Sequence, residues 1–236
     1  MSQSRIRQIT GLMLVVVPVL FTACFTILQV RFEYPDILRQ PTAAVLVKFQ
    51  AGGAGLIAAW YALTFSAILF MPLAVLVSRA LGGERAPVGL GLAAALGVAA
   101  GLVQSLGFLR WPFLVPQLAA SYLAPAASPA QRETATLIFE AFHQYAGVAI
   151  GEHLGFLCTA AWTFLVALAV GRSPLFSRWL GPAGALLALG IAAGTLEPLD
   201  WQAAGPINAI SYLAWALWLI VLGVLLLRRR SVAGGR

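Results

Sequence analysis

Charged residues are scarce in this sequence, and several long stretches contain none. Only 10% of the 236 residues are Asp, Glu, Lys or Arg, whereas 61% are hydrophobic, and the mean hydropathy is +0.89. This composition excludes an ordinary soluble domain and favours a chain that lies in a lipid bilayer. The net charge of +7 does not indicate binding to nucleic acid, because the basic residues stand at the ends of apolar stretches rather than on one solvated face.

Cysteine and histidine are also rare, with two of each. Two cysteines exclude a disulfide framework, and we expect Cys24 and Cys158 to be free, buried thiols. Two histidines, His143 and His153, exclude a three-histidine metal site. The residues "FTAC" before position 25 faintly resemble a lipoprotein cleavage box, but Phe21 stands where leucine is usual. We therefore expect the first apolar stretch to remain as a membrane span.

The sequence has seven intervals without a charged residue or histidine, and about 20 helical residues suffice to cross a bilayer. The interval 111–131 contains four prolines, each of which would leave a backbone carbonyl unsatisfied in lipid. We reject it as a span. The sequence therefore predicts an all-α, six-helix membrane bundle that forms a single domain over 1–236. The expected spans are 9–29, 51–78, 87–109, 152–171, 180–197 and 205–227.

The distribution of basic residues predicts the orientation of these spans. With both termini in the cytoplasm, ten of the fifteen basic residues lie on the cytoplasmic side, as the positive-inside rule requires. Those ten are Arg5, Arg7, Arg79, Arg85, Arg172, Arg178, Arg228, Arg229, Arg230 and Arg236. Of the acidic residues, only Glu84 is expected there. We predict a location in the bacterial cytoplasmic (inner) membrane, with the lipid bilayer as the main partner and no nucleic acid.

The segment at about 111–150 is expected to be re-entrant or to form an amphipathic helix at the outer surface. Ser128, Pro129 and Gln131 have the pattern of a helix start with a capping box. One helix from 129 to 171 would measure about 64 Å, about twice the thickness of the hydrocarbon core. It must therefore either project outward or break, and Gly147 and Gly151 are the natural positions for a break.

Within this segment, both histidines and two carboxylates fall between residues 140 and 153. Glu140 and His143 have the Glu-x-x-His spacing that places two metal ligands on one side of a helix. A membrane-embedded, metal-dependent enzyme using Glu140, His143, Glu152 and His153 is therefore one hypothesis. The candidate ligands of a transition metal are Glu140, His143 and His153. Because no second such motif and no nucleophile pattern accompanies them, we predict no cofactor and favour a non-enzymatic protein.

Two other interpretations of these polar residues remain open. Arg110 and Glu152 are expected at the same depth on adjacent helices, where an ion pair would cancel two charges that are costly near lipid. Alternatively, an outward-facing polar layer binds a small ligand or a membrane-protein partner, as in a sensor, an accessory subunit or a carrier. The main residues of that layer are Arg110, Glu140, His143, Glu152, His153 and Asn208, and Thr22, Thr26, Gln29, Gln104, Ser211 and Trp215 could contribute to it.

Tryptophan positions and small residues predict how the helices pack. Trp111, Trp179 and Trp201 stand near expected interfaces, where tryptophan is common, whereas Trp60, Trp162, Trp215 and Trp218 are expected inside the bundle. A small residue recurs every fourth position in the third span, which is typical of close helix packing. These positions are Ala93, Gly97, Gly101 and Ser105.

Three parts of the sequence carry a resemblance to a known family. They read "FEYPDILRQP" with "GLIAAWYAL", then "LGFLRWPFLVPQLA", then "FEAFHQYAGVAIGEHLGFL". The chain resembles the bacterial integral membrane proteins of domain-of-unknown-function family 4386 over about residues 9–227. The resemblance implies a multi-span bacterial membrane protein. It implies no activity and no catalytic residues.

Overall fold

A computed structural model describes residues 2–82 and 88–233 of the chain. Six helices are long and apolar enough to cross a membrane, as predicted, and the protein is a membrane protein. Glu84, Arg85 and Arg236, which entered the charge count, lie outside the described residues, as do the side chains of Arg229 and Arg230. The elements are α1 (Gln3–Phe32), η1 (Asp36–Arg39), α2 (Thr42–Gly82), α3 (Val88–Phe113), α4 (Val115–Leu123), α5 (Pro129–Phe142), the π-helix η2 (His143–Leu154), α6 (Gly155–Arg172), α7 (Leu180–Ala193), η3 (Gly194–Leu199) and α8 (Ala204–Ala233).

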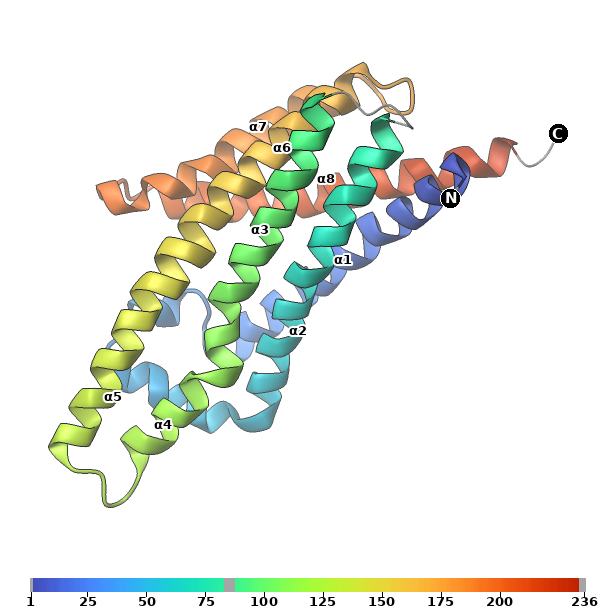
Figure 1. The fold of residues 1–236 in the computed structure, drawn as a ribbon. Coiled ribbons are helices and arrows are strands. Elements are labelled where there is room, and N and C mark those ends of the chain that lie inside the picture. Colours follow the sequence, from blue (N-terminus) through green and yellow to red (C-terminus); the bar gives the residue numbers. More distant parts are fainter. Residues whose placement is uncertain (1, 83–87, 234–236) are drawn as a thin grey trace.

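The six spans form a closed ring. In chain order α1, α2, α3, α6 and α7 each pack on the next, α7 packs on α8, and α8 packs back on α1. The two chain ends lie at the same end of the bundle (Figure 1). We call the opposite end, which carries η1, α4, α5 and η3, the distal end. The expected small-residue stripe of α3 is a packing face, since a Cβ added at Gly97 would clash with Ala74 and Trp162, and one at Gly101 with the carbonyl oxygen of Ala67.

The distal end has a hydrophobic core of its own, built around stacked tryptophans. Trp60 of α2 and Trp111 of α3 are fully buried, with ring centroids 4.7 Å apart and planes at 9°. Phe32, Phe49 and Phe139 pack around them. The prediction that Trp111 lies at the membrane interface is therefore wrong, because the first turns of α2 and the helices α4 and α5 cover it. Trp179 and Trp201 are exposed as expected, and Trp162, Trp215 and Trp218 are buried as expected.

A single residue turns the first part of α2 across the distal end. Gly53 has φ 54° and ψ −153°, a conformation that is essentially restricted to glycine. Residues before it run across the bundle, and residues after it follow the bundle axis (Figure 1). The sequence prediction placed the start of this span at 51, close to this bend. Lys48, in the part of α2 before Gly53, forms an ion pair with Glu33.

The helix that begins at Pro129 continues without a break to Arg172, over 44 residues. Its start is the predicted capping box of Ser128 and Gln131. At about 1.5 Å per residue it measures roughly 66 Å, so it projects beyond the bilayer core at the distal end. The expected break at Gly147 and Gly151 is absent, because the chain instead widens into the π-helix there. Both glycines lie where other groups approach the helix closely, Arg110 at Gly147 and Gly107 at Gly151.

Candidate functional site: the distal polar cluster

Arg110, at the distal end of α3, is the most deeply buried charged side chain that the structure describes, with 8% exposed. Its guanidinium lies flat against the π-helix at Gly147, where an added Cβ would come within 2.6 Å of Cζ. Gly147 is thus a contact surface for a cation rather than a hinge. Three residues before Arg110, Gly107 meets Gly151 of the π-helix, and a Cβ at Gly107 would lie 2.7 Å from the Gly151 Cα.

The hydrogen bonds of Arg110 involve neutral partners only. Nη1 donates to the carbonyl oxygen of Gly107, and Nη2 lies 3.4 Å from Nδ1 of His143. A guanidinium has no acceptor, so Nδ1 must accept, and the His143 proton sits on Nε2. Nε of Arg110 is buried without a partner among the described residues. The Arg110 guanidinium also lies over the ring of Trp111, 5.2 Å from its centroid.

The expected ion pair between Arg110 and Glu152 is not formed. Within the described part of the chain, the ion pairs closer than 4.0 Å are Arg39 with Asp36 and Lys48 with Glu33. Glu152 lies on the π-helix within electrostatic range of Arg110, Arg39 and Glu197, and it forms no ion pair closer than 4.0 Å with either arginine. Arg110 does not pair with Glu152 because its guanidinium instead lies against the π-helix at His143 and Gly147.

Several further polar groups reach the same region from other helices. Glu197 of η3 and Arg39 of η1 both lie beside Gly205 at the start of α8, where an added Cβ would be 2.6 Å from Oε1 and 3.7 Å from Nη2 respectively. Tyr34, just after α1, lies within electrostatic range of Glu152, Arg110 and Tyr212. We call this group the distal polar cluster, and its members are Tyr34, Arg39, Arg110, His143, Glu152, Glu197 and Tyr212.

Tyr34 and Arg39 are the members of this cluster that stand outside the spans. Burial, and then the negative charge of Glu152, raise the pKa of Tyr34 above its usual range. Its hydroxyl therefore stays protonated at neutral pH and remains a hydrogen-bond donor. Sequence reasoning missed Tyr34, Arg39 and Tyr212 as site residues. Only the topology reveals them, because Tyr34 and Arg39 lie in the connection after α1 and Tyr212 lies in α8, and the ring brings these elements to one end.

Three of the predicted site residues lie outside the cluster. Glu140 accepts a hydrogen bond from the Thr42 hydroxyl at 2.9 Å, which ties α5 to the first turn of α2. Asn208 is buried and donates to the Ile191 carbonyl oxygen at 2.7 Å, so it joins α8 to α7. His153 is half-buried and forms no hydrogen bond or ion pair with any described residue.

The metal hypothesis required Glu140, His143, Glu152 and His153 to converge. Among the described residues, no three His, Cys, Asp or Glu side chains form a group that could hold a metal ion. The Arg110 guanidinium also occupies the Nδ1 side of His143. Cys24 and Cys158 are both free thiols, as expected. Of these four residues, His143 contacts the buried guanidinium of Arg110, whereas Glu140 binds Thr42.

Comparison with known sequences agrees with this membrane architecture. Residues 9–232 match the profile of the family described as "Domain of unknown function (DUF4386)". The chain belongs to the DUF4386 family. No curated protein and no solved structure matches this DUF4386 chain. The family match spans all six helices and both sides of the distal polar cluster, so the cluster lies within the family domain.

Proposed function

We propose that this DUF4386 protein is a non-enzymatic protein of the bacterial cytoplasmic membrane. In this proposal the distal end faces outward, both termini are cytoplasmic, and the distal polar cluster binds a small ligand that carries an anionic group. A sensor, an accessory subunit or a carrier would use such a site. The orientation rests on the excess of basic residues at the end with the termini.

The observation that carries the proposal is the environment of Arg110. A buried guanidinium beside lipid is costly unless an anion neutralises it. Here its hydrogen-bond partners are a carbonyl oxygen and a neutral imidazole, and no described carboxylate lies within 4.0 Å. An anionic group of a ligand would supply the missing charge. Glu152, which lies within electrostatic range of Arg110 but is not paired with it, would accept hydrogen bonds from other parts of the ligand.

Ligand binding is testable by thermal unfolding of the purified protein in detergent at constant ionic strength. The probes are acetate, succinate, glycine, glutamate, sulfate and inorganic phosphate. We expect at least one of them to raise the melting temperature, since a ligand at 100 times its Kd stabilises the folded state by about 2.7 kcal/mol.

The matched variants are Arg110→Met and Arg132→Met. Arg110→Met removes an unpaired buried charge, so it should keep or raise the melting temperature without ligand and lose the response to the probe. Arg132 is exposed near Tyr122, outside the cluster, and Arg132→Met should respond as the wild type does. The proposal is wrong if no probe shifts the melting temperature, or if Arg110→Met responds fully.

A further inference from the structure

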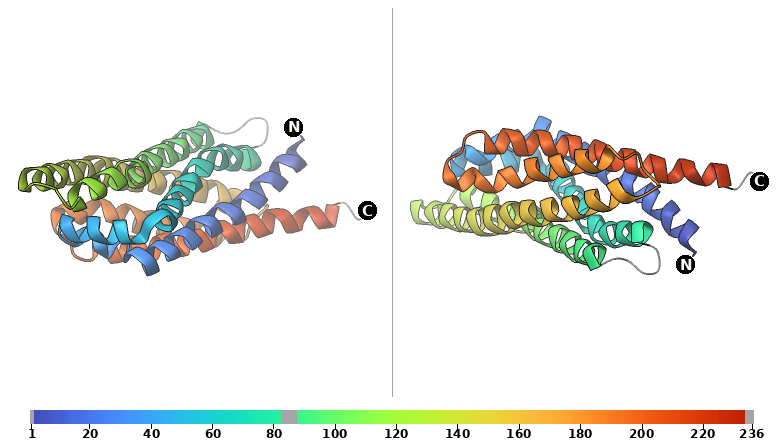
Figure 2. Two further views of the ribbon diagram at one scale, coloured as in Figure 1. Left: turned by 90° about the horizontal axis from the view of Figure 1, so that it is seen from below. Right: turned by 90° about the horizontal axis from the view of Figure 1, so that it is seen from above.

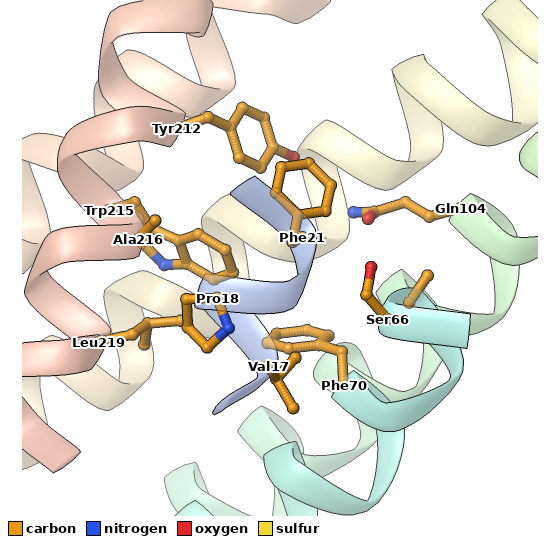
Figure 3. Close-up of a pocket in the computed structure, with 11 residues that line it drawn as sticks. Val17, Pro18, Phe21, Ser66, Phe70, Gln104, Tyr212, Trp215, Ala216 and Leu219 are labelled. Atoms are coloured by element: carbon orange, nitrogen blue, oxygen red, sulfur yellow. The ribbon is translucent and has the colours of Figure 1, made fainter. Parts of the chain in front are cut away.

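A small cavity lies inside the helix ring, between α1, α2, α3 and α8. Its volume is about 30 Å³. Most of its wall is apolar, but the polar side chains of Ser66, Gln104 and Tyr212 also line it, together with Trp215 (Figure 3). The apolar residues that complete the wall are Val17, Pro18, Phe21, Ala67, Phe70, Ala216 and Leu219.

The way in which α1 and α8 cross explains why the ring leaves space here. The two helices touch at Gly11 and Gly223, where a Cβ added at Gly223 would come within 2.7 Å of the Gly11 carbonyl oxygen. From that crossing they diverge toward the distal end (Figures 1 and 2). Side chains fill the space between them only in part. Phe70 of α2 and Trp215 of α8 pack edge to face at this space, with ring centroids 5.7 Å apart.

The polar atoms at the wall are not fully satisfied by the protein. Gln104 Nε2 donates to the Thr159 hydroxyl at 2.9 Å, but no described residue donates to Gln104 Oε1. An acceptor that the protein leaves without a donor favours an occupant that can donate a hydrogen bond to it.

The chemistry of the wall defines what fits it. No charged side chain lines the cavity, so its occupant is uncharged. The occupant must donate a hydrogen bond to Gln104 Oε1. In Figure 3 the polar ends of Gln104, Ser66 and Tyr212 point into one common space. A volume of about 30 Å³ holds about two water molecules.

The cavity and the distal polar cluster share one residue, Tyr212. Tyr212 belongs to both, since it lines the cavity and lies within electrostatic range of Glu152 and Tyr34. We infer that the cavity is a hydrated site for water or an uncharged hydrogen-bonding solute of that size, reached from the distal face past Tyr212. This inference concerns the interior of the ring and does not depend on the anionic ligand proposed for Arg110.

Cysteine accessibility tests the inference in membranes. Ser66→Cys and Ser78→Cys are matched, because both serines are buried in α2 and each donates its hydroxyl to a carbonyl oxygen of its own helix. Only Ser66 lines the cavity. The variants are made in a Cys24→Ala, Cys158→Ala background. Iodoacetamide, a small, uncharged and water-soluble reagent for thiolates, is added from the distal side.

We expect Ser66→Cys to react at least about tenfold faster than Ser78→Cys, a difference of about 1.4 kcal/mol in activation free energy. Ala67→Cys, at a second position in the cavity wall, should also react faster than Ser78→Cys. Equal rates at positions 66, 67 and 78 would overturn the inference. The inference would also be overturned if Ser66→Cys and Ala67→Cys reacted with a lipid-soluble maleimide but not with the water-soluble reagent. The cavity would then open to lipid rather than to water.

Discussion

Replacement of Trp60 by alanine is expected to lower the free energy of unfolding by about 3–5 kcal/mol, as for other large-to-small changes in a packed core. Trp60 is fully buried and packs against Trp111, Phe32, Tyr34 and Phe108, with centroid distances from 4.7 to 6.2 Å. These partners come from α1, its following turn and α3, so the loss would loosen the whole distal end. The measurement is reversible unfolding in mixed micelles.

Trp179→Ala is the matched control for this variant. Trp179 is 64% exposed at the opposite end of the bundle, so its removal leaves no cavity. We expect a change of less than about 0.5 kcal/mol, as for most surface substitutions. Similar losses in the two variants would mean that the stacked tryptophans do not form the core of the distal end.

Replacement of Gly107 by leucine is expected to prevent α3 from packing on the π-helix. Even a Cβ at Gly107 would lie 2.7 Å from the Gly151 Cα and 3.1 Å from the Ala146 carbonyl oxygen, and backbone cannot move aside as a side chain can. Overpacking of this kind costs about 1–3 kcal/mol for a methyl group, and a leucine side chain adds to that cost. We expect Gly107→Ala to lower the melting temperature and Gly107→Leu to yield little monodisperse protein.

Gly91→Leu, on the same helix, is the control for the change in helix propensity and in size. Nothing lies within 4 Å of a Cβ added at Gly91, so leucine is accommodated there. Size-exclusion chromatography of the solubilised variants measures the outcome. If Gly107→Leu elutes as a monodisperse protein with an unchanged melting temperature, the close approach of Gly107 to Gly151 is not present in the protein.

The six spans could be predicted because hydrocarbon imposes a simple rule on sequence. A segment that crosses it must be apolar for about 20 residues, and a segment with several prolines cannot satisfy its carbonyls there. The exact ends of the helices could not be predicted in this way. α1 begins at Gln3 and α2 at Thr42, well before the expected positions 9 and 51, because helices continue past the apolar stretch into polar surroundings.

The course of the chain near Gly147 shows a different limit. Glycine in a helical pattern indicates either a break or a close contact, and sequence alone does not distinguish them. Here the glycines make close contacts, and the residues that they contact, Arg110 and Gly107, lie about 40 residues earlier in the chain. The burial of Trp111 also depends on distant parts of the chain. Its neighbour Arg110 suggested an interface, but α4 and α5 fold over Trp111.

The candidate site was predicted in part. Arg110, His143 and Glu152 do lie in one region, because the sequence already placed two helix ends at the same depth. Glu140 and Asn208 instead connect helices. Whether a polar side chain in a span binds another helix or faces an open site depends on helix rotation. Rotation is poorly determined in these helices because apolar residues surround them on nearly every side.

The most direct test of the account is the side of the membrane on which the distal polar cluster lies. Gln202 and Ser177 are exposed in the connections at the two ends of α7, so Gln202→Cys and Ser177→Cys report on opposite faces. With Cys24 and Cys158 replaced by alanine, a membrane-impermeant maleimide should label Gln202→Cys in intact cells and Ser177→Cys only after lysis. Labelling of Ser177→Cys but not Gln202→Cys in intact cells would place the cluster in the cytoplasm and contradict the account.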